Sequence, residues 1–167
     1  MAPAVRRASH DVMRIRLLAV GTKMPAWVEQ GVETYRKRLP RDFTLEIEEI
    51  PLGQRGKNAD IAKARAQEAQ RIREKLRGDE IVVALEVKGK PWTTEQLARE
   101  ADAWRMEGRD VVLLVGGPDG LEPSLSATAD KAWSLSPLTL PHPLVRIMLA
   151  EQLYRAWTLL VGHPYHR

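Results

Sequence analysis

The sequence predicts a single α/β domain in which a mostly parallel β-sheet carries helices on both faces. Short apolar runs alternate with longer amphipathic or charged segments along the whole chain. The apolar runs are nearly continuous, as in IVVALEV (81–87), which is typical of strands buried on both faces. The length of 167 residues suits one well-buried domain, and no repeat, low-complexity segment or linker divides it.

The first half of the chain is expected to supply two strands and two helices. IRLLAV (15–20) is an apolar run that ends at a glycine, which indicates a buried strand. The segment 25–38 opens with a proline and carries one apolar stripe, which predicts a helix. FTLEIEEI (43–50) partly alternates and predicts a strand with one wetter face. A long charged helix is expected over about 59–77, where a glycine stops it.

The second half is more apolar and is expected to complete the sheet. After the strand at 81–87, a threonine caps a helix over about 94–107. DVVLLVGGPDG (110–120) reads as a strand that ends in three glycines, and a short helix spans roughly 123–132. WSLSPLTL (133–140) is strand-like, although it contains a proline.

The last expected helix begins at Pro143 and runs to about Val161. Its apolar side chains cover more than one face, whereas a helix on a protein surface needs a single stripe. The helix is therefore either central in the core or buried by a partner subunit, and we favour a homodimer that forms through it. Its polar side is expected to hold Arg146, Glu151 and Arg155.

Composition excludes several classes of protein. Without cysteine the chain has no disulfide and no thiolate metal site, which fits a reducing cytoplasm, and we expect no metal. No apolar run reaches 18 residues, so we expect no membrane span. The net charge of +4 permits a polyanionic partner without demanding one. Residues 1–12 lack periodicity and are either a short disordered arm or the product of a start codon assigned too early, so the domain is expected over 13–167.

Two of the expected strands end in glycine-containing loops, LEVKGKPW (85–92) and GGPDG (116–120). Ligands of open parallel sheets bind beyond the carboxyl ends of the strands, and glycine lets the backbone approach a ligand closely. Gly116, Gly117 and Gly120 therefore form a candidate floor for a nucleoside-sized molecule, unless they serve turn geometry alone. Their spacing does not match the dinucleotide-binding fingerprint.

The loop GQRGKN (53–58) carries cations but lacks the spacing and the serine or threonine of a P-loop. We interpret Arg55 and Lys57 as cations suited to a phosphate backbone. A solvated charged loop explains them equally well on sequence alone.

The carboxyl end concentrates groups that transfer protons and bind phosphate. Three of the four histidines, His142, His163 and His166, lie between residue 142 and the end of the chain. A terminus normally frays. The tail is therefore either a basic segment in solvent or a segment that folds back to complete a site, and we favour the second interpretation.

Several segments together carry a family resemblance: VGTKMPAWV (20–28), RGKNADI (55–61), LEVKGKPW (85–92), GGPDG (116–120), WSLSPLTLPHPLVR (133–146), EQLYRAW (151–157) and HPYHR (163–167). With these motifs the chain resembles the RlmH family, bacterial methyltransferases of the SPOUT superfamily that act on a pseudouridine of large-subunit ribosomal RNA. The resemblance extends over about 13–167 with little sign of insertion.

The resemblance implies a fold, a methyl donor and a substrate. The fold would include a C-terminal trefoil knot, a rare exception to the rule against threaded chains. The protein would be a cytoplasmic homodimer that uses S-adenosylmethionine to methylate N3 of a pseudouridine in 23S rRNA on the assembled ribosome, with no DNA or membrane partner. The residues that match the donor pocket, to which we add Gly116 from the glycine loop, are Leu85, Gly117, Ser136, Pro137, Leu138, Thr139, Leu140 and Pro141.

The catalytic candidates lie mainly in the tail. His166 is expected to act as base or proton relay when N3 loses its proton. Tyr165 would stack on or orient the target base, and Arg155 and Arg167 would hold the developing anion or a phosphate. His142, between two prolines at a helix start, has either a catalytic or a structural role. Because the tail follows the helix expected at the dimer seam, we expect it to complete the partner's donor pocket.

A small protein with this net charge is expected to recognise a ribosomal surface and to bind it with a steep salt dependence. Two other classes remain open. One is a non-catalytic ribosome-binding protein with the same fold, which would not bind the donor. The other is a nucleotide hydrolase, which the lack of a P-loop and of clustered acids disfavours. The cations expected to contact RNA are Arg36, Lys37, Arg38, Arg41, Arg55 and Lys57.

Overall fold

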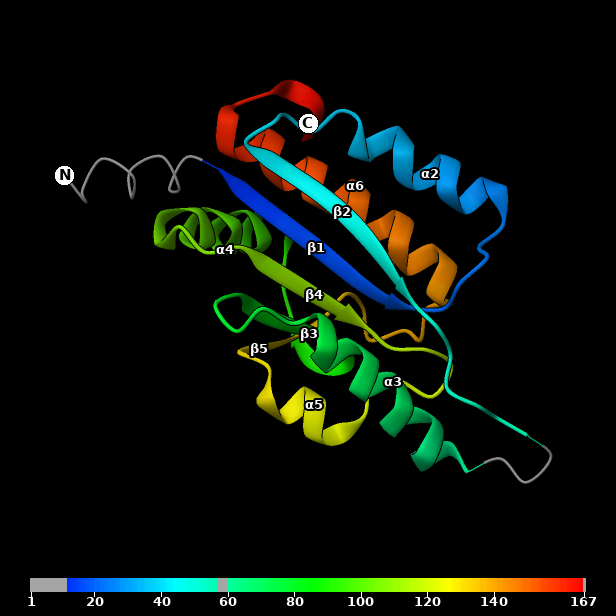
Figure 1. Cartoon of the computed structure of the whole chain (residues 1–167). Helices are drawn as coiled ribbons and strands as arrows, with labels where there is room; N and C mark the ends of the chain where they lie inside the picture. The colour runs from blue at the N-terminus through cyan, green and yellow to red at the C-terminus, as the bar shows by residue number, and fades with distance from the viewer. Residues whose placement is uncertain (1–11, 57–59, 167) are drawn as a thin grey trace.

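A computed structural model describes residues 12–56 and 60–166 of the chain, and its centre is a five-stranded, wholly parallel sheet (Figure 1). The strands follow the order β2-β1-β4-β3-β5 across the sheet. They are β1 (Met13–Val20), β2 (Phe43–Ile50), β3 (Ile81–Pro91), β4 (Val111–Val115) and β5 (Lys131–Ser134). The helices are α2 (Ala26–Arg36), α3 (Ile61–Lys75), α4 (Thr94–Glu107), α5 (Pro123–Thr128) and α6 (His142–Val161), and a 3-10 turn, η1 (Pro164–His166), follows.

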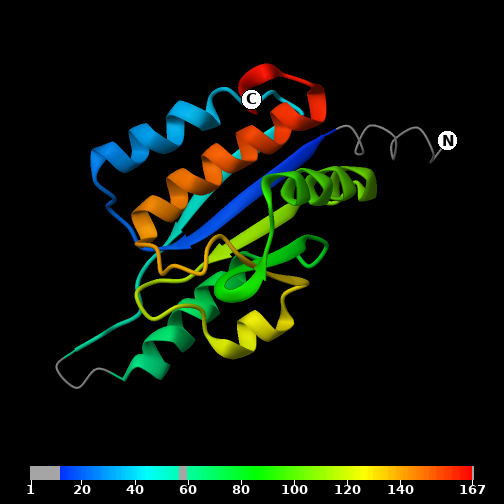
Figure 2. The same ribbon diagram turned by 180° about the vertical axis from the view of Figure 1, so that it is seen from behind.

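Helices cover both faces of the sheet, as the sequence predicts. One core joins the sheet to α2, α4 and α6 through side chains such as Val32, Leu97 and Leu153. The other joins it to α3 and α5 through Ile72 and Leu125. Figure 2, seen from behind, shows α6 running between α2 and α4. The predicted fold class, a parallel α/β sheet covered on both faces, is confirmed.

Helix α6 lies in the core of its own chain. Three of its own side chains, those of Leu149, Leu153 and Ala156, are fully buried. The helix packs against α2 closely enough that a Cβ atom on Gly31 would lie 2.7 Å from Cδ1 of Ile147. One side of the helix is therefore buried in the chain's own core, whereas Leu144 and Val161 are 41% and 53% exposed, and the expected dimer through this helix stays a prediction. Across the described ranges no helix is both long and apolar enough to span a membrane.

Some expected boundaries are wrong. The strand expected over 133–140 stops at Ser134, because Ser134 and Ser136 hydrogen-bond the local backbone and Pro137 removes a donor from the ladder. The helix expected to reach 132 ends at Thr128, since β5 begins at Lys131. The helix expected over 59–77 spans Ile61–Lys75 in the described part.

The segment between β5 and α6 lies beside the turn that follows β4, because both line one cavity (Figure 2). The expected trefoil knot stays a prediction. The expected arm over 1–12 lies outside the described residues except for its last position.

Candidate active site

A cavity of about 950 Å³ opens at the carboxyl ends of β3 and β4. This is where ligands bind in open parallel sheets. Three segments wall it: residues 85–88 in the second half of β3, the glycine turn after β4, and the loop that leads into α6. Of the residues expected to bind the donor, the cavity is lined by Leu85, Gly116, Gly117, Ser136, Leu138, Thr139, Leu140 and Pro141, whereas Pro137 is not part of its wall.

The glycine turn needs its glycines for close packing and for backbone geometry. A Cβ atom on Gly116 would lie 2.4 Å from the carbonyl carbon of Gly120. Gly120 has φ +76°, a left-handed conformation that favours glycine, and its N–H donates to the carbonyl of Gly117 at 3.0 Å. The glycines therefore serve the geometry of the turn, and because the same turn forms a wall of the cavity, their expected contact with a ligand stays a prediction.

His142 ties the start of α6 to the glycine turn. Its Nδ1 lies 3.1 Å from the carbonyl oxygen of Gly116, and Nε of Arg146 donates to its Nε2 at 3.0 Å. Because a guanidinium only donates, Nε2 must accept, so Nδ1 carries the proton and donates to Gly116. Burial lowers the pKa of His142, and the charge of Arg146 lowers it further. A neutral ring with both nitrogens engaged favours the structural interpretation of His142.

Arg146 was expected on the polar side of its helix, and that expectation is wrong. The residue is only 4% exposed. Its guanidinium pairs with Glu49 at 2.7 Å and donates to the carbonyl of Gly21 at 2.8 Å. In the sequence, one feature indicates the contact with His142: Arg146 follows it by four residues, and this spacing places the two side chains on one face of a helix.

Arg55 is paired with acids on two other segments. Its Nε donates to Asp119 in the glycine turn at 2.9 Å, and its Nη1 donates to Glu68 of α3 at 2.7 Å. Hydrogen bonding to Glu68, followed by that to Asp119, raises the pKa of Arg55. The residue thus holds its loop against the glycine turn, and its proposed contact with RNA stays a prediction. Lys57 lies outside the described residues.

The tail folds back along α6 to contact residues in the middle of the helix. The Tyr165 hydroxyl donates to Glu151 at 3.2 Å, and its ring packs edge-on against Tyr154 at 4.6 Å between centroids. Arg155 pairs with Glu151 at 2.6 Å and lies 5.0 Å from the centre of the Tyr165 ring. Burial and the charge of Glu151 raise the pKa of Tyr165, so the phenol keeps its proton. Nδ1 of His166 is buried without a hydrogen-bond partner among the described residues.

Exposed cations gather near the tail. Arg36 pairs with Glu33 on α2, and Arg38 lies 5.7 Å from the ring centres of both Tyr35 and Tyr154. The structure therefore brings part of the expected RNA-binding set beside the tail, separate from Arg55. That set at the end of α2 is Arg36, Lys37, Arg38 and Arg41. Arg167 lies outside the described residues.

The two groups of expected site residues lie along different parts of α6. His142 and Val145, at its start, line the cavity, whereas Tyr165 contacts Glu151 and Tyr154 in its middle. Glu151 follows His142 by nine residues, which at 1.5 Å per residue is about 14 Å. Figures 1 and 2 show the tail (red) folded back beside α6, away from the loop that leads into the helix (orange). Within one chain, the tail and the cavity do not form one site.

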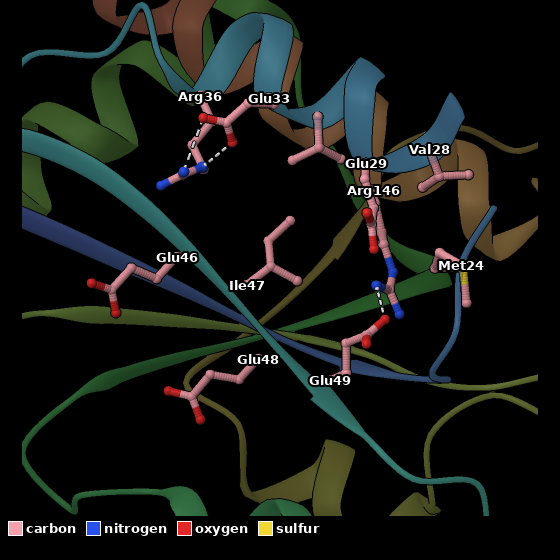
Figure 3. Close-up of a pocket in the computed structure, with 11 residues that line it drawn as sticks. Met24, Val28, Glu29, Glu33, Arg36, Glu46, Ile47, Glu48, Glu49 and Arg146 are labelled. Carbon is pink, nitrogen blue, oxygen red and sulfur yellow. Dashed lines mark hydrogen bonds and ion pairs between the residues drawn. The ribbon is translucent and has the colours of Figure 1, made fainter. Parts of the chain in front are cut away.

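A second, smaller cavity of about 480 Å³ lies between α2 and β2 (Figure 3). Its floor is apolar, with Met24, Val28 and Ile47, and its rim carries five glutamates. Arg146 forms part of its wall, where it pairs with Glu49. This guanidinium therefore separates the small cavity from His142.

Relatives match the chain along most of its length. The chain is 64% identical over 155 residues to the ribosomal RNA large subunit methyltransferase H of Chromohalobacter salexigens, covering 93% of this chain and all of that protein. Identity to the protein of the same name from Pseudomonas putida W619 is 59%, with the same coverage.

Solved structures share the fold at low identity. A probable methyltransferase from Bordetella pertussis Tohama I has a TM-score of 0.53 at 15% identity, covering 92% of this chain and 98% of that one. A probable methylase family protein from Haemophilus influenzae has a TM-score of 0.54 at 12% identity, covering 95% and 71%. The family model described as predicted SPOUT methyltransferase matches residues 13–166. The chain therefore belongs to the SPOUT methyltransferase family, in the RlmH group of ribosomal RNA large subunit methyltransferases.

Proposed function

We propose that the protein is a ribosomal RNA methyltransferase that transfers a methyl group from S-adenosylmethionine to N3 of a pseudouridine in 23S rRNA. We further propose that it acts in the cytoplasm, on the assembled ribosome, as a homodimer. Relatives named ribosomal RNA large subunit methyltransferase H support the activity, since they match 93% of this chain at 59–64% identity.

The cavity at the end of β3 and β4 suits an adenosyl group. Its volume of about 950 Å³ is near the upper end of the range for small-molecule sites. Leu85, Leu138 and Leu140 supply apolar surface, and the glycine turn brings main-chain polar groups to the wall. When bound there, S-adenosylmethionine supplies an electrophilic methyl group.

The separation of cavity and tail along α6 is the observation that carries the homodimer proposal. If the tail handles the acceptor base, we expect it to reach a cavity in another subunit, because no described tail residue lines its own cavity and its contact with Glu151 lies about 14 Å along α6 from His142. A twofold dimer would repeat this arrangement and give two composite sites. Large exposed apolar side chains at the cavity end, Trp27, Leu138 and Leu144, offer surface for such contact.

The tail supplies the groups that N3 methylation needs. N3 carries a proton, so a base must accept it as the new bond forms. Nδ1 of His166, which has no hydrogen-bond partner among residues 12–56 and 60–166, is the candidate for that step. Arg155, oriented by Glu151, would stabilise negative charge on the uracil ring, and Tyr165 would orient the ring. The cations at the end of α2 would bind nearby phosphates.

The test uses tritiated S-adenosylmethionine with ribosomes from a strain that lacks this activity. We expect label to enter 23S rRNA at N3 of one pseudouridine, with much less label on protein-free 23S rRNA. Calorimetry in parallel measures the affinity for S-adenosylmethionine. Donor binding without transfer to ribosomes would contradict the catalytic proposal, and absence of both donor binding and transfer would favour the non-catalytic ribosome-binding alternative.

A further inference from the structure

Arg146 is the most buried guanidinium near the cavity, and it serves three different segments. Its Nη1 pairs with Glu49 of β2, as Figure 3 shows, and its Nη2 donates to the carbonyl of Gly21 after β1. Its Nε donates to His142. All three nitrogens are thus used in three directions, at distances of 2.7–3.0 Å.

The contact with His142 links Arg146 to the wall of the donor cavity, because His142 in turn contacts Gly116. By occupying Nε2 of His142, Arg146 leaves the proton on Nδ1, which donates to the carbonyl of Gly116. Without that donor, only the carbonyl of Gly116 would favour the proton on Nδ1, and the ring could also place it on Nε2. An unprotonated Nδ1 would then face a carbonyl oxygen, and two acceptors would repel each other.

We propose that Arg146 is a positioning residue for the donor pocket: it sets the tautomer and orientation of His142, and His142 holds the carbonyl of Gly116 so that the glycine turn keeps the shape that receives the donor. Arg146 itself does not line the donor cavity, whereas His142 and Gly116 do. The inference rests on the proposed function, because it assigns that cavity to S-adenosylmethionine.

The packing around the guanidinium leaves little freedom for another arrangement. A Cβ atom on Gly21 would lie 3.7 Å from Nη2 of Arg146 and 3.7 Å from Nε2 of His142. The backbone after β1 therefore closes directly over both groups. A lysine at 146 would present one nitrogen in place of a planar fork and could not serve the three acceptors together.

The first arm of the test replaces Arg146 with methionine, which keeps much of the apolar bulk and removes every donor. The matched control is Arg105→Met, which removes a partly exposed guanidinium that pairs with Asp102 within α4. Calorimetry measures the affinity for S-adenosylmethionine, and long-range ¹H–¹⁵N correlation spectra report the tautomer of His142. We expect R146M to weaken donor binding about tenfold or more and to lose the single Nδ1–H tautomer, with Arg146→Lys giving no recovery. R105M should match the wild type in both.

The second arm leaves Arg146 in place and separates the two ring nitrogens of His142. In His142→Asn, the amide nitrogen can take the place of Nδ1 and donate to Gly116. In His142→Gln, the amide lies nearer the position of Nε2, so it can meet Arg146 but not Gly116. We expect H142N to retain clearly more donor affinity than H142Q.

Two results would overturn the inference: R146M binding the donor as R105M does while His142 keeps its tautomer, or H142Q binding as well as H142N. If R146M does not fold, as its melting curve would reveal, the two His142 variants decide alone. A wild-type protein that has no affinity for S-adenosylmethionine would instead refute the proposed function. The tautomer spectra of the wild type and R146M would still test the contact between Arg146 and His142 without the donor.

Discussion

The contacts beside the cavity and the contacts beside the tail, both along α6, are made by different kinds of groups. At the cavity end, the close contacts are made by main-chain groups, such as the carbonyl oxygens of Gly116 and Gly117. At the tail end, they are made by side chains, with Glu151 accepting from both Arg155 and Tyr165. The glycine turn at the cavity requires residues without side chains, whereas the cluster at the tail requires the functional groups of its side chains.

This difference predicts opposite sensitivities to mutation. A backbone-lined cavity tolerates few added atoms, because each new Cβ meets main chain that cannot rotate away. A side-chain cluster loses its chemistry when a functional group is removed, although its backbone keeps its shape. Adding atoms should therefore weaken donor binding, whereas removing groups from the tail should slow the methyl transfer step.

The largest effect is expected from His166→Ala. The variant should lower the rate of methyl transfer on ribosomes about 100-fold, a typical contribution of a positioned acid or base. Its affinity for S-adenosylmethionine should change by less than about threefold, because His166 is proposed to act on the acceptor base and does not line the donor cavity. Single-turnover kinetics and calorimetry separate the two quantities. His163→Ala, which alters the exposed tail histidine, is the matched control and should lose much less activity.

Mixed dimers extend this prediction to the shared site. His166→Ala protein mixed with a donor-pocket variant such as Gly116→Ala should recover activity, because each mixed dimer has one site with an intact cavity and an intact tail. An equal mixture would reach about a quarter of the wild-type rate if subunits exchange randomly between twofold dimers. Mixtures no more active than their separate components, after exchange is verified, would contradict the composite site.

The second prediction compares two adjacent glycines. Neither Gly116 nor Gly117 has a positive φ, so alanine differs from glycine at both positions mainly by the contacts of its Cβ atom. At Gly116 that atom meets backbone at 2.4 Å, whereas at Gly117 it meets the side chains of Val20 and Leu52 at 3.0 and 3.2 Å. We expect Gly116→Ala to weaken donor binding about tenfold or more, and Gly117→Ala to weaken it only a few-fold. Equal affinities in calorimetry would show that the turn yields more easily than its contacts indicate.

Much of the fold could be predicted from local patterns. The uninterrupted apolar run VVLLV in β4 has every residue buried, as expected for a strand covered on both faces. The glycines after β4 indicated a close approach of the backbone, and they line the cavity. These features depend on residues near one another in the chain, which is why a sequence pattern reveals them.

The side-chain partners could not be predicted in the same way. Arg146 pairs with Glu49 and Gly21, which precede it by 97 and 125 residues. Arg55 pairs with Asp119, 64 residues away. A charged residue on a helix or loop normally faces solvent, and only the assembled sheet brings these particular acceptors to the two arginines. Local sequence patterns therefore do not predict contacts between residues so far apart in the chain.

The smallest effect on donor affinity is expected from Arg55, whose loop contacts the glycine turn beside the cavity. Arg55→Met removes both the pair with Asp119 and the pair with Glu68, and so releases the loop from the glycine turn. We expect donor affinity to fall about threefold to fivefold, the order of 1 kcal/mol that a partly exposed ion pair contributes. Asp119→Asn should act in the same direction, and the double variant should be less impaired than the two single effects combined, because the two residues share one contact.

Ribosome binding distinguishes this interpretation from a direct contact between Arg55 and RNA. A phosphate contact predicts that Arg55→Met weakens ribosome binding and reduces its salt dependence, whereas Asp119→Asn, which removes a negative charge, does not weaken it. A positioning contact predicts that both variants change donor affinity and neither changes the salt dependence. Titrations of ribosomes at two salt concentrations, beside donor calorimetry, decide between the two. A normal donor affinity in both variants would assign Arg55 to the RNA-binding set and leave the glycine turn to be held by His142.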